Sequence, residues 1–304
     1  MTRPRSLGRR ILRILLWLVL GLLALLAVMT ALNWDLVQRL FLGGVKVYET
    51  EAPKLPADIK RPAILVFSKT NGFRHDEPIK LGHALFADMA KENGWGHYQT
   101  ENGAAFSPEI LSRFDAVVFN NVSGDVFTAG QRAALKAFLE KGGGFVGVHA
   151  SGGDFSYKWN WYVNALIGTQ FKGHPMDPQF QKATVRVEDK TNPATAALPD
   201  TWERTDEWYS FEKSPRGPGF TILATLDEST YSPEMNMPWA STDIRMGKDH
   251  PIIWTHCIGT GRIFYSALGH ANESYAEPLF RQHLAGATKW ALRAEGTGCE
   301  AKAP

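Results

Sequence analysis

The chain has 304 residues, of which 44% are hydrophobic and 12% aromatic, so it can bury a full core and is too apolar for a disordered protein. Its formal net charge is +2, and five arginines before residue 14 exceed that value, which leaves the rest of the chain slightly acidic. That remainder holds no basic cluster and no nucleic-acid-binding motif, so we expect no binding of DNA or RNA.

An apolar segment near the N-terminus predicts a membrane anchor. Residues 14–34, ILLWLVLGLLALLAVMTALNW, carry no charge and are long enough to cross a bilayer as a helix. The five arginines lie in the flank 1–13, whereas Asp35 follows the segment, so the positive-inside rule places the N-terminus in the cytoplasm. A cleavable signal would have a shorter apolar region and a clear small-x-small site, so an uncleaved anchor is favoured. We therefore expect a single-pass inner-membrane protein whose domain lies on the periplasmic, extracytoplasmic side.

A tether and the first elements of a domain follow the anchor. Residues 35–61 are mixed in polarity and contain proline, which predicts a tether, and the domain is expected over residues 62–293. Residues 63–69, AILVFSK, form a short apolar run rich in branched side chains, which is typical of a strand. Residues 77–94 show apolar side chains at helical spacing and end in glycine, so they predict a helix.

The alternation of strands and helices continues to residue 150. The pattern predicts helices at 107–114 and 128–144 and apolar strands at 115–121 and 144–150. Strands separated by helices of this length predict a parallel sheet with helices on both faces. In such sheets ligands bind beyond the carboxyl ends of the strands.

Three polar segments follow strands of this predicted sheet. They are residues 67–77, FSKTNGFRHDE; residues 119–125, FNNVSGD; and residues 148–155, VHASGGDF. Because the carboxyl ends of parallel strands meet at one edge of a sheet, we expect these segments to lie together.

The second half of the domain has a different pattern, with strands and few helices between them. The strand-like segments are residues 182–189, 204–212, 220–227, 251–259 and 261–269. They predict that antiparallel strands extend the sheet, before a helix at 277–293 closes the domain and residues 294–304 form a tail. The predicted fold class is therefore α/β, with a mixed, mainly parallel sheet.

The two cysteines do not indicate a disulfide scaffold. Cys257 lies in an apolar strand and Cys299 in the polar tail. This placement favours two unpaired thiols over a single bridge.

The nine histidines divide by their sequence context. Five adjoin turn or loop residues: His75, His149, His174, His250 and His270. We expect His83, His97 and His283 to lie on helix or strand surfaces. His256 lies within a predicted strand and is expected to have a structural role.

The histidines at turns, together with acidic residues, suggest reactive chemistry. His149 and His270 each end an apolar strand near a glycine, and Asp206 and Glu207 lie beside two aromatic residues. Histidines with a carboxylate suit a borderline divalent ion such as zinc, and they equally suit general acid/base catalysis near neutral pH. The chain has neither HExxH nor CxxC, so the spacing of these residues does not decide between a metal site and general acid/base catalysis.

Several separated motifs, in this order, resemble one known family. They are FSKTNGFRHDEPI, GGGFVGVHASGGDF, FKGHP, LPDTWERTDEWYSF, PIIWTHCIGTGRIFYSALGH and ATKWAL. Together they resemble the ThuA-like, or trehalose-utilisation, family, whose domain is similar to the flavodoxin-like fold of class I glutamine amidotransferases. The resemblance extends from about Pro62 to Arg293 and does not include the anchor.

The resemblance also excludes one activity. Glutamine amidotransferases carry a nucleophilic cysteine in a strained turn after a strand, and the motif GVHASG places His149 there. Cys257 lies on a different strand, so no residue at that turn can form the acyl intermediate, and the chain is not expected to be a glutamine amidotransferase.

The family implies carbohydrate metabolism, with a disaccharide or 3-keto sugar as the expected small-molecule substrate. The hypothesis is an enzyme, and a non-catalytic sugar-binding module is the alternative; the oligomeric state is left open. The predicted catalytic residues are His75, His149, His174, Glu207 and His270, and all of these except His75 are predicted ligands of a zinc-like divalent metal. The predicted substrate-binding residues are Asn120, Asp154, Trp159, Asp206, Trp208 and Tyr209.

Overall fold

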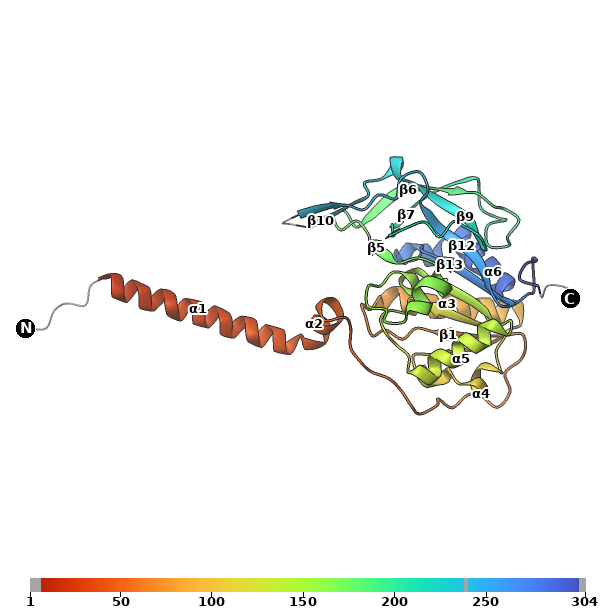
Figure 1. The fold of residues 1–304 in the computed structure, drawn as a ribbon, viewed down its shortest axis with the longest axis horizontal. Coiled ribbons are helices and arrows are strands. Elements are labelled where there is room, and N and C mark those ends of the chain that lie inside the picture. Colours follow the sequence, from red (N-terminus) through yellow and green to blue (C-terminus); the bar gives the residue numbers. More distant parts are fainter. Residues whose placement is uncertain (1–6, 238–239, 301–304) are drawn as a thin grey trace, which may run out of the picture.

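The computed structural model describes residues 7–237 and 240–300. Helix α1, Leu7–Leu32, extends from the domain as a separate rod (Figure 1). Its segment Gly8–Leu32 is long and apolar enough to span a membrane, and none of its most apolar stretch is buried. The predicted span 14–34 covers most of this helix, whereas residues 1–6 of the basic flank lie outside the described part of the chain.

A short second helix joins the rod to the domain. Helix α2, Trp34–Phe41, occupies the start of the predicted tether, and the segment after it has no regular structure up to β1.

One half of the central sheet is parallel. Its strands, in spatial order, are β2 (Gly96–Thr100), β1 (Ala63–Phe67), β3 (Ala116–Asn120), β4 (Gly144–Val148) and β13 (Gly261–Ser266). Strands β1, β3 and β4 are buried along their whole length because helices cover both faces. The predicted parallel sheet is therefore present, and β2 extends it at one edge by a strand that the sequence pattern did not predict.

The other half of the sheet is antiparallel. From β13 it continues through β12 (Pro251–Ile258), β9 (Phe220–Asp227), β6 (Phe180–Val187) and β7 (Thr201–Glu207). Two small pairs lie beside it: β5 (Phe171–Gly173) with β8 (Ser210–Phe211), and the hairpin β10 (Glu234–Met237) with β11 (Ala240–Asp243). The predicted mixed sheet is thus confirmed.

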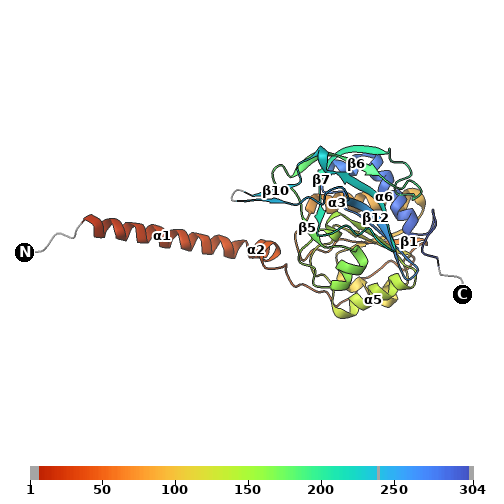
Figure 2. The same ribbon diagram turned by 45° about the horizontal axis from the view of Figure 1, so that its top comes forward.

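The helices form layers on the two faces of the sheet (Figures 1 and 2). Helices α3 (Asp76–Asn93) and α6 (Pro278–Ala291) share one face, and α4 (Pro108–Leu111) and α5 (Ala129–Glu140) share the other. Short 3-10 turns lie at Gly103–Ala105, His149–Gly152, Glu228–Thr230 and Asn272–Ala276, and a π-helical turn at Tyr162–Ile167. Helix α5 begins with a capping box between Thr128 and Gln131, which satisfies two N–H groups at its start.

The cysteine prediction is wrong, because Cys257 and Cys299 form a disulfide. The guanidinium group of Arg262 donates to backbone carbonyls of Glu295, Gly296 and Gly298, which folds the C-terminal segment back onto β12 and β13. That return places the second cysteine beside the first, and no local pattern in the sequence shows it.

The surface assignment of His283 is also wrong. Its ring is buried, with Nδ1 2.8 Å from the carbonyl oxygen of Ala194 and Nε2 3.1 Å from the hydroxyl of Ser266. Two partners inside the protein replace the water that a surface histidine would contact. His256 has the predicted structural place, since Nε2 lies 2.8 Å from the carbonyl oxygen of Leu166.

Candidate functional site

Two of the site's histidines lie at the carboxyl ends of parallel strands. His75 ends the loop after β1 and immediately precedes α3. His149 follows β4 with a φ angle of +47°, a left-handed conformation that is costly for a residue with a side chain. The predicted tight turn is therefore present, and it directs the imidazole away from the strand.

His149 is fully buried at this turn. Glu207 at the end of β7 is buried beside it, and His270 follows β13. One ligand atom from each of His75, His149, Glu207 and His270 lies within 4.8 Å of the other three. We call these four residues the His/Glu cluster; strands from both halves of the sheet bring them together.

Three buried polar atoms of the His/Glu cluster have no hydrogen-bond partner: His75 Nδ1, Glu207 Oε2 and His270 Nδ1. His270 Nδ1 lies only 2.8 Å from Glu207 Oε2, yet the two atoms are not aligned as donor and acceptor. An unsatisfied buried polar atom costs roughly 1–3 kcal/mol, so three that converge on one point need a cause. A bound cation would satisfy all three.

The fourth member of the cluster has a defined tautomer. His149 Nδ1 lies 2.8 Å from the carbonyl oxygen of Ala267, so Nδ1 must carry the proton and donate it. Nε2 then has a free lone pair, which accepts from the Tyr209 hydroxyl at 2.8 Å and lies 3.3 Å from Glu207 Oε2. A cation at Nε2 would compete with Tyr209 for that lone pair.

The protonation states also suit a cation. Burial lowers the pKa of His75 well below its usual value, and the neighbouring histidines His149 and His270 lower it further. Burial likewise lowers the pKa of His149. Burial raises the pKa of Glu207, but the close approach of His149, His270 and His174 outweighs burial and holds that pKa well below the usual range. Neutral imidazoles around an ionised carboxylate are the forms that bind a metal.

Further residues hold the His/Glu cluster in place. The carboxylate of Asp206 accepts from the backbone N–H groups of Gly269, His270 and Ala271 at 2.9, 3.0 and 2.9 Å, which fixes the loop that carries His270. Gln179 donates to Glu207 Oε1, which orients the carboxylate.

His174, a predicted metal ligand, lies outside the cluster. Its Nδ1 is 3.1 Å from Glu207 Oε1 and 2.8 Å from the carbonyl oxygen of Pro175. The structure places His75 among the converging ligand atoms instead. The predicted role of His174 as a ligand stays a prediction.

Two hollows meet at the cluster. One, of about 570 Å³, is lined by His75, Glu207 and His270 together with Asp154 and Tyr209. We call it the anchor-side pocket, because residues of α2 also line it. The other hollow, of about 670 Å³, shares Phe73, His75 and His270 with it. A ligand with two parts could therefore reach the cluster from both sides.

Four of the predicted substrate-binding residues line neither hollow. Asn120 is buried and donates to the carbonyl oxygen of Ile79, and the indole of Trp208 donates to that of Gln181. Trp159 stacks on Trp161 and lines a separate, small hollow, and Asp206 is fully buried as the loop support described above. These four residues therefore pack within the protein or position other residues. Asp154 and Tyr209, in contrast, line the anchor-side pocket.

Other lining residues were not predicted. Gln179, Phe73, Phe155 and Met176 contribute to the anchor-side pocket. Phe73 and Phe155 lie inside the polar segments quoted above, where an apolar side chain among turn residues was a signal that could have been used. Gln179 has no distinguishing local pattern.

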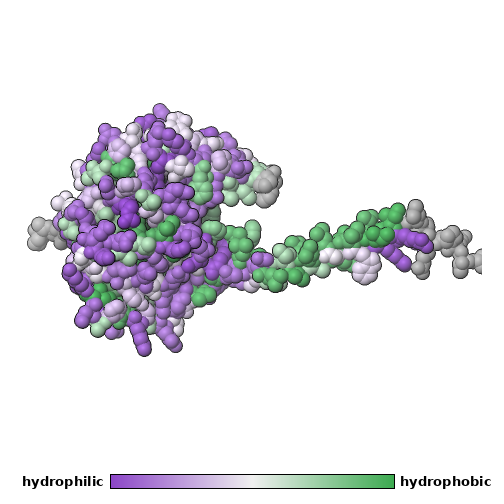
Figure 3. All heavy atoms as spheres, turned by 180° about the vertical axis from the view of Figure 1, so that it is seen from behind, coloured by the Kyte–Doolittle hydropathy of each residue, from purple (hydrophilic) through white to green (hydrophobic). Residues whose placement is uncertain are grey.

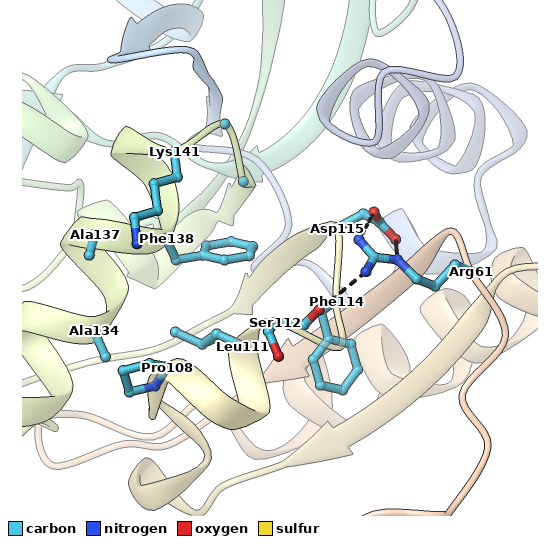
Figure 4. A pocket seen from close by; sticks show the side chains of 12 residues that line it. Arg61, Pro108, Leu111, Ser112, Phe114, Asp115, Ala134, Ala137, Phe138 and Lys141 are labelled. Carbon is cyan, nitrogen blue, oxygen red and sulfur yellow. Dashed lines mark hydrogen bonds and ion pairs between the residues drawn. The ribbon is translucent and has the colours of Figure 1, made fainter.

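A hollow at the other end of the sheet has a different character (Figure 4). It measures about 420 Å³ and lies where β1, β3 and β4 begin, between α4 and α5. Its charged groups include Arg61 and Asp115, which pair with each other, and Asp115 also accepts from the backbone N–H of Ala63. No histidine lines it.

Comparison with known proteins agrees with the fold. A sequence model of the ThuA family, described as trehalose utilisation, matches residues 63–291. A ThuA-like protein from Bacteroides uniformis has a similar structure, with a TM-score of 0.65 and 23% identity over 79% of this chain and 95% of that one. Another ThuA-like protein, from Parabacteroides merdae, has a TM-score of 0.58 and 20% identity over 79% of this chain and 92% of that one. No curated protein matches the sequence.

Proposed function

The chain belongs to the ThuA, or trehalose utilisation, family, and from this membership and the His/Glu cluster we propose an enzyme that uses a divalent metal to transform a saccharide. The expected substrate is a disaccharide or a 3-keto sugar. We further propose that α1 anchors the enzyme in the inner membrane and that the domain lies on the periplasmic side, because the basic flank precedes the apolar helix.

The observation that carries this proposal is the set of unpartnered buried atoms in the cluster. His75 Nδ1, Glu207 Oε2 and His270 Nδ1 each lack a hydrogen bond, although they line or adjoin a pocket large enough for a sugar. Three imidazoles and one carboxylate form a donor set that fits zinc. When bound, such an ion supplies Lewis acidity toward a sugar carbonyl or hydroxyl oxygen.

The chain's own residues would bind the substrate and move protons. Burial raises the pKa of the Tyr209 phenol well above its usual value, so this hydroxyl stays protonated and can donate to a sugar oxygen. Asp154 is buried and burial raises its pKa, which favours a carboxyl group that can exchange a proton with the substrate. His174, partly exposed at the pocket wall, can accept from a sugar hydroxyl.

The two hollows support a substrate of two sugar units. His75 and His270 line both, so one unit can lie in each hollow while the bond between them lies at the cluster. A single hexose would leave one hollow filled with water.

The test is zinc content and turnover of the purified full-length chain, compared between His270→Ala and His283→Ala. Both remove a histidine, but only His270 belongs to the cluster; His283 has both ring nitrogens bonded inside the fold. We expect His270→Ala to lower zinc affinity and turnover by about tenfold or more, and His283→Ala to lower thermal stability alone.

Turnover is measured on a panel of disaccharides and their 3-keto derivatives. Equal zinc retention in both variants would contradict the metal site. Zinc and sugar binding without turnover of any panel member would favour the sugar-binding module over the enzyme.

A further inference from the structure

Helix α2 is fixed to the loop that carries His75. The guanidinium group of Arg39 donates to the carbonyl oxygens of Thr70 and Gly72 at 2.8 and 3.0 Å. After α2 the chain passes so close to this loop that a Cβ at Gly44 would lie 2.5 Å from the carbonyl oxygen of Asn71, and Gly44 has a φ angle of +91°. Only glycine fits there without strain. The helix next to the anchor is therefore part of the domain rather than a free tether.

The same helix forms a wall of the anchor-side pocket. Arg39, Leu40 and Phe41 from its last turn, and Gly43 after it, line the pocket that also contains Glu207 and His270. The access route to the His/Glu cluster thus runs past the residues that emerge from the anchor.

The pocket mouth lies near the end of the membrane-spanning helix. Helix α1 ends at Leu32 and the eight residues of α2 add roughly 12 Å of helix. Trp34, an exposed indole at the junction, is typical of the interface between membrane and water. The hairpin β10–β11 projects from the same side of the domain as α1 in both ribbon views (Figures 1 and 2).

The rim of the site is apolar and exposed. From residue 50 onward, the large hydrophobic side chains that are exposed in the described chain are Phe73, Phe155, Met176 and Phe180, and all four line one of the two hollows at the cluster. Phe155, the most exposed, shows 64% of its surface. Single exposed apolar residues are ordinary, but their confinement to one site marks a surface that contacts an apolar partner.

Exposed apolar residues of α2 continue this rim toward the anchor. Leu40 and Phe41 line the pocket and are 48% and 77% exposed, and Leu36 and Leu42 are exposed beside them. In the space-filling view the apolar surface of α1 extends to its junction with the domain (Figure 3). Leu40 and Phe41 thus place exposed apolar side chains both at the pocket and on the helix next to the anchor.

We infer that the site takes the saccharide headgroup of a membrane lipid, with the acyl chains left in the bilayer and the apolar rim in contact with it. The inference rests on the proposed function, because the headgroup is the sugar that the His/Glu cluster would act on. A soluble sugar needs aromatic faces inside the pocket, which Tyr209 and Phe171 supply; it gives no reason for Phe155, Met176 and Phe41 to face solvent beside the membrane.

The experiment uses the full-length chain in phosphatidylcholine vesicles. One sample contains a mixture of mono- and diglycosyl diacylglycerols, a second contains the same headgroups after removal of both acyl chains, and a third has neither. Hydrogen–deuterium exchange is followed over residues 150–156 and 171–180, which carry most of the rim. We expect the glycolipids to slow exchange there by about tenfold or more, and the deacylated headgroups to have little effect at the same sugar concentration.

A rim variant tests the cause of that protection. Phe155→Ser combined with Met176→Ser should lose it, while Val47→Ser, which also removes an exposed apolar side chain but one outside both hollows, should keep it. Thermal stability and zinc content of each variant show that it is folded and that the cluster is intact.

Equal protection by soluble headgroups, or protection by neither sample, overturns the inference. In either case zinc retention by the same preparation shows that the proposed metal site stands without it. Loss of the zinc site itself would instead contradict the proposed function.

Discussion

The two ends of the parallel sheet are built from the same strands and differ in how their polar groups are satisfied. At the amino ends of β1 and β3, Arg61 and Asp115 pair with each other and with nearby backbone (Figure 4). At the carboxyl ends, His75, Glu207 and His270 are held with atoms that have no hydrogen bond. A stable fold would satisfy both ends. The two ends therefore differ in their unsatisfied hydrogen-bonding atoms, not in whether they contain charged residues.

The largest effect on stability is expected at the amino end, where the disulfide joins the end of β12 to the C-terminal segment. The bridge closes a segment of 42 residues, so replacing both cysteines, Cys257→Ser with Cys299→Ser, should cost about 4 kcal/mol of unfolding free energy. Zinc affinity should not change. Thermal unfolding in detergent measures the stability, and zinc titration of the folded variant measures the affinity. A loss of zinc binding in the folded variant would contradict the prediction that the disulfide does not affect the site at the other end of the sheet.

At the carboxyl end, Glu207→Gln keeps the shape of the side chain and removes its charge. We expect zinc affinity to fall by about a hundredfold or more, because the variant removes the one anionic ligand of the cluster.

The matched control is Glu228→Gln. Glu228 also contacts a histidine, His250, at 2.7 Å, but its oxygens are satisfied by the backbone N–H groups of Met246 and Gly247 as well. Isothermal titration should give this control nearly the wild-type affinity. Equal losses of zinc affinity in the two variants would show that removing either carboxylate charge weakens zinc binding, and would contradict the specific role of Glu207 as a ligand.

The buried histidine outside the site predicts a pH dependence. Burial lowers the pKa of His283 from 6.5 to about 4. Since the folded state binds the proton more weakly than the unfolded state, its stability is complete above about pH 6.5 and falls as the pH drops toward 4. We expect a loss of about 2 kcal/mol between about pH 7 and about pH 5. His283→Gln should show a smaller loss over the same interval, and an identical slope in unfolding measurements would contradict the assignment.

The smallest effect is expected for Arg61→Ala. Its guanidinium is half exposed and pairs with Asp115, and exposed pairs contribute less than about 1 kcal/mol. Thermal stability should fall slightly, and zinc affinity and turnover should equal those of the wild type. A clear loss of activity would show that the two ends of the sheet are coupled.

Much of the fold follows from local sequence patterns. Apolar runs such as residues 63–69 and 144–150 predicted parallel strands, and the motif GVHASG predicted the tight turn at His149, because hydrophobic periodicity and turn chemistry are local. The change to antiparallel strands after residue 180 was also visible.

The site was predicted less completely, because its geometry depends on contacts between distant segments. The structure brings three histidines at turns, His75, His149 and His270, into the cluster, but the sequence could not distinguish the place of His75 in the cluster from that of His174. The carboxylate of Asp206 resembled a substrate ligand and instead binds the backbone of residues 269–271. The disulfide and the docking of α2 through Arg39 are likewise contacts between segments far apart in the sequence. Hydrophobic periodicity predicts local elements and not such contacts.

The most direct measurement is anomalous X-ray diffraction from crystals of the full-length chain grown with zinc, with data recorded on both sides of the zinc absorption edge. We expect one strong anomalous peak among His75, His149, Glu207 and His270, at about 2.0–2.2 Å from each ligand atom. A map with no peak there, or with its peak at another place in a correctly folded chain, would contradict the metal site and with it the proposed chemistry.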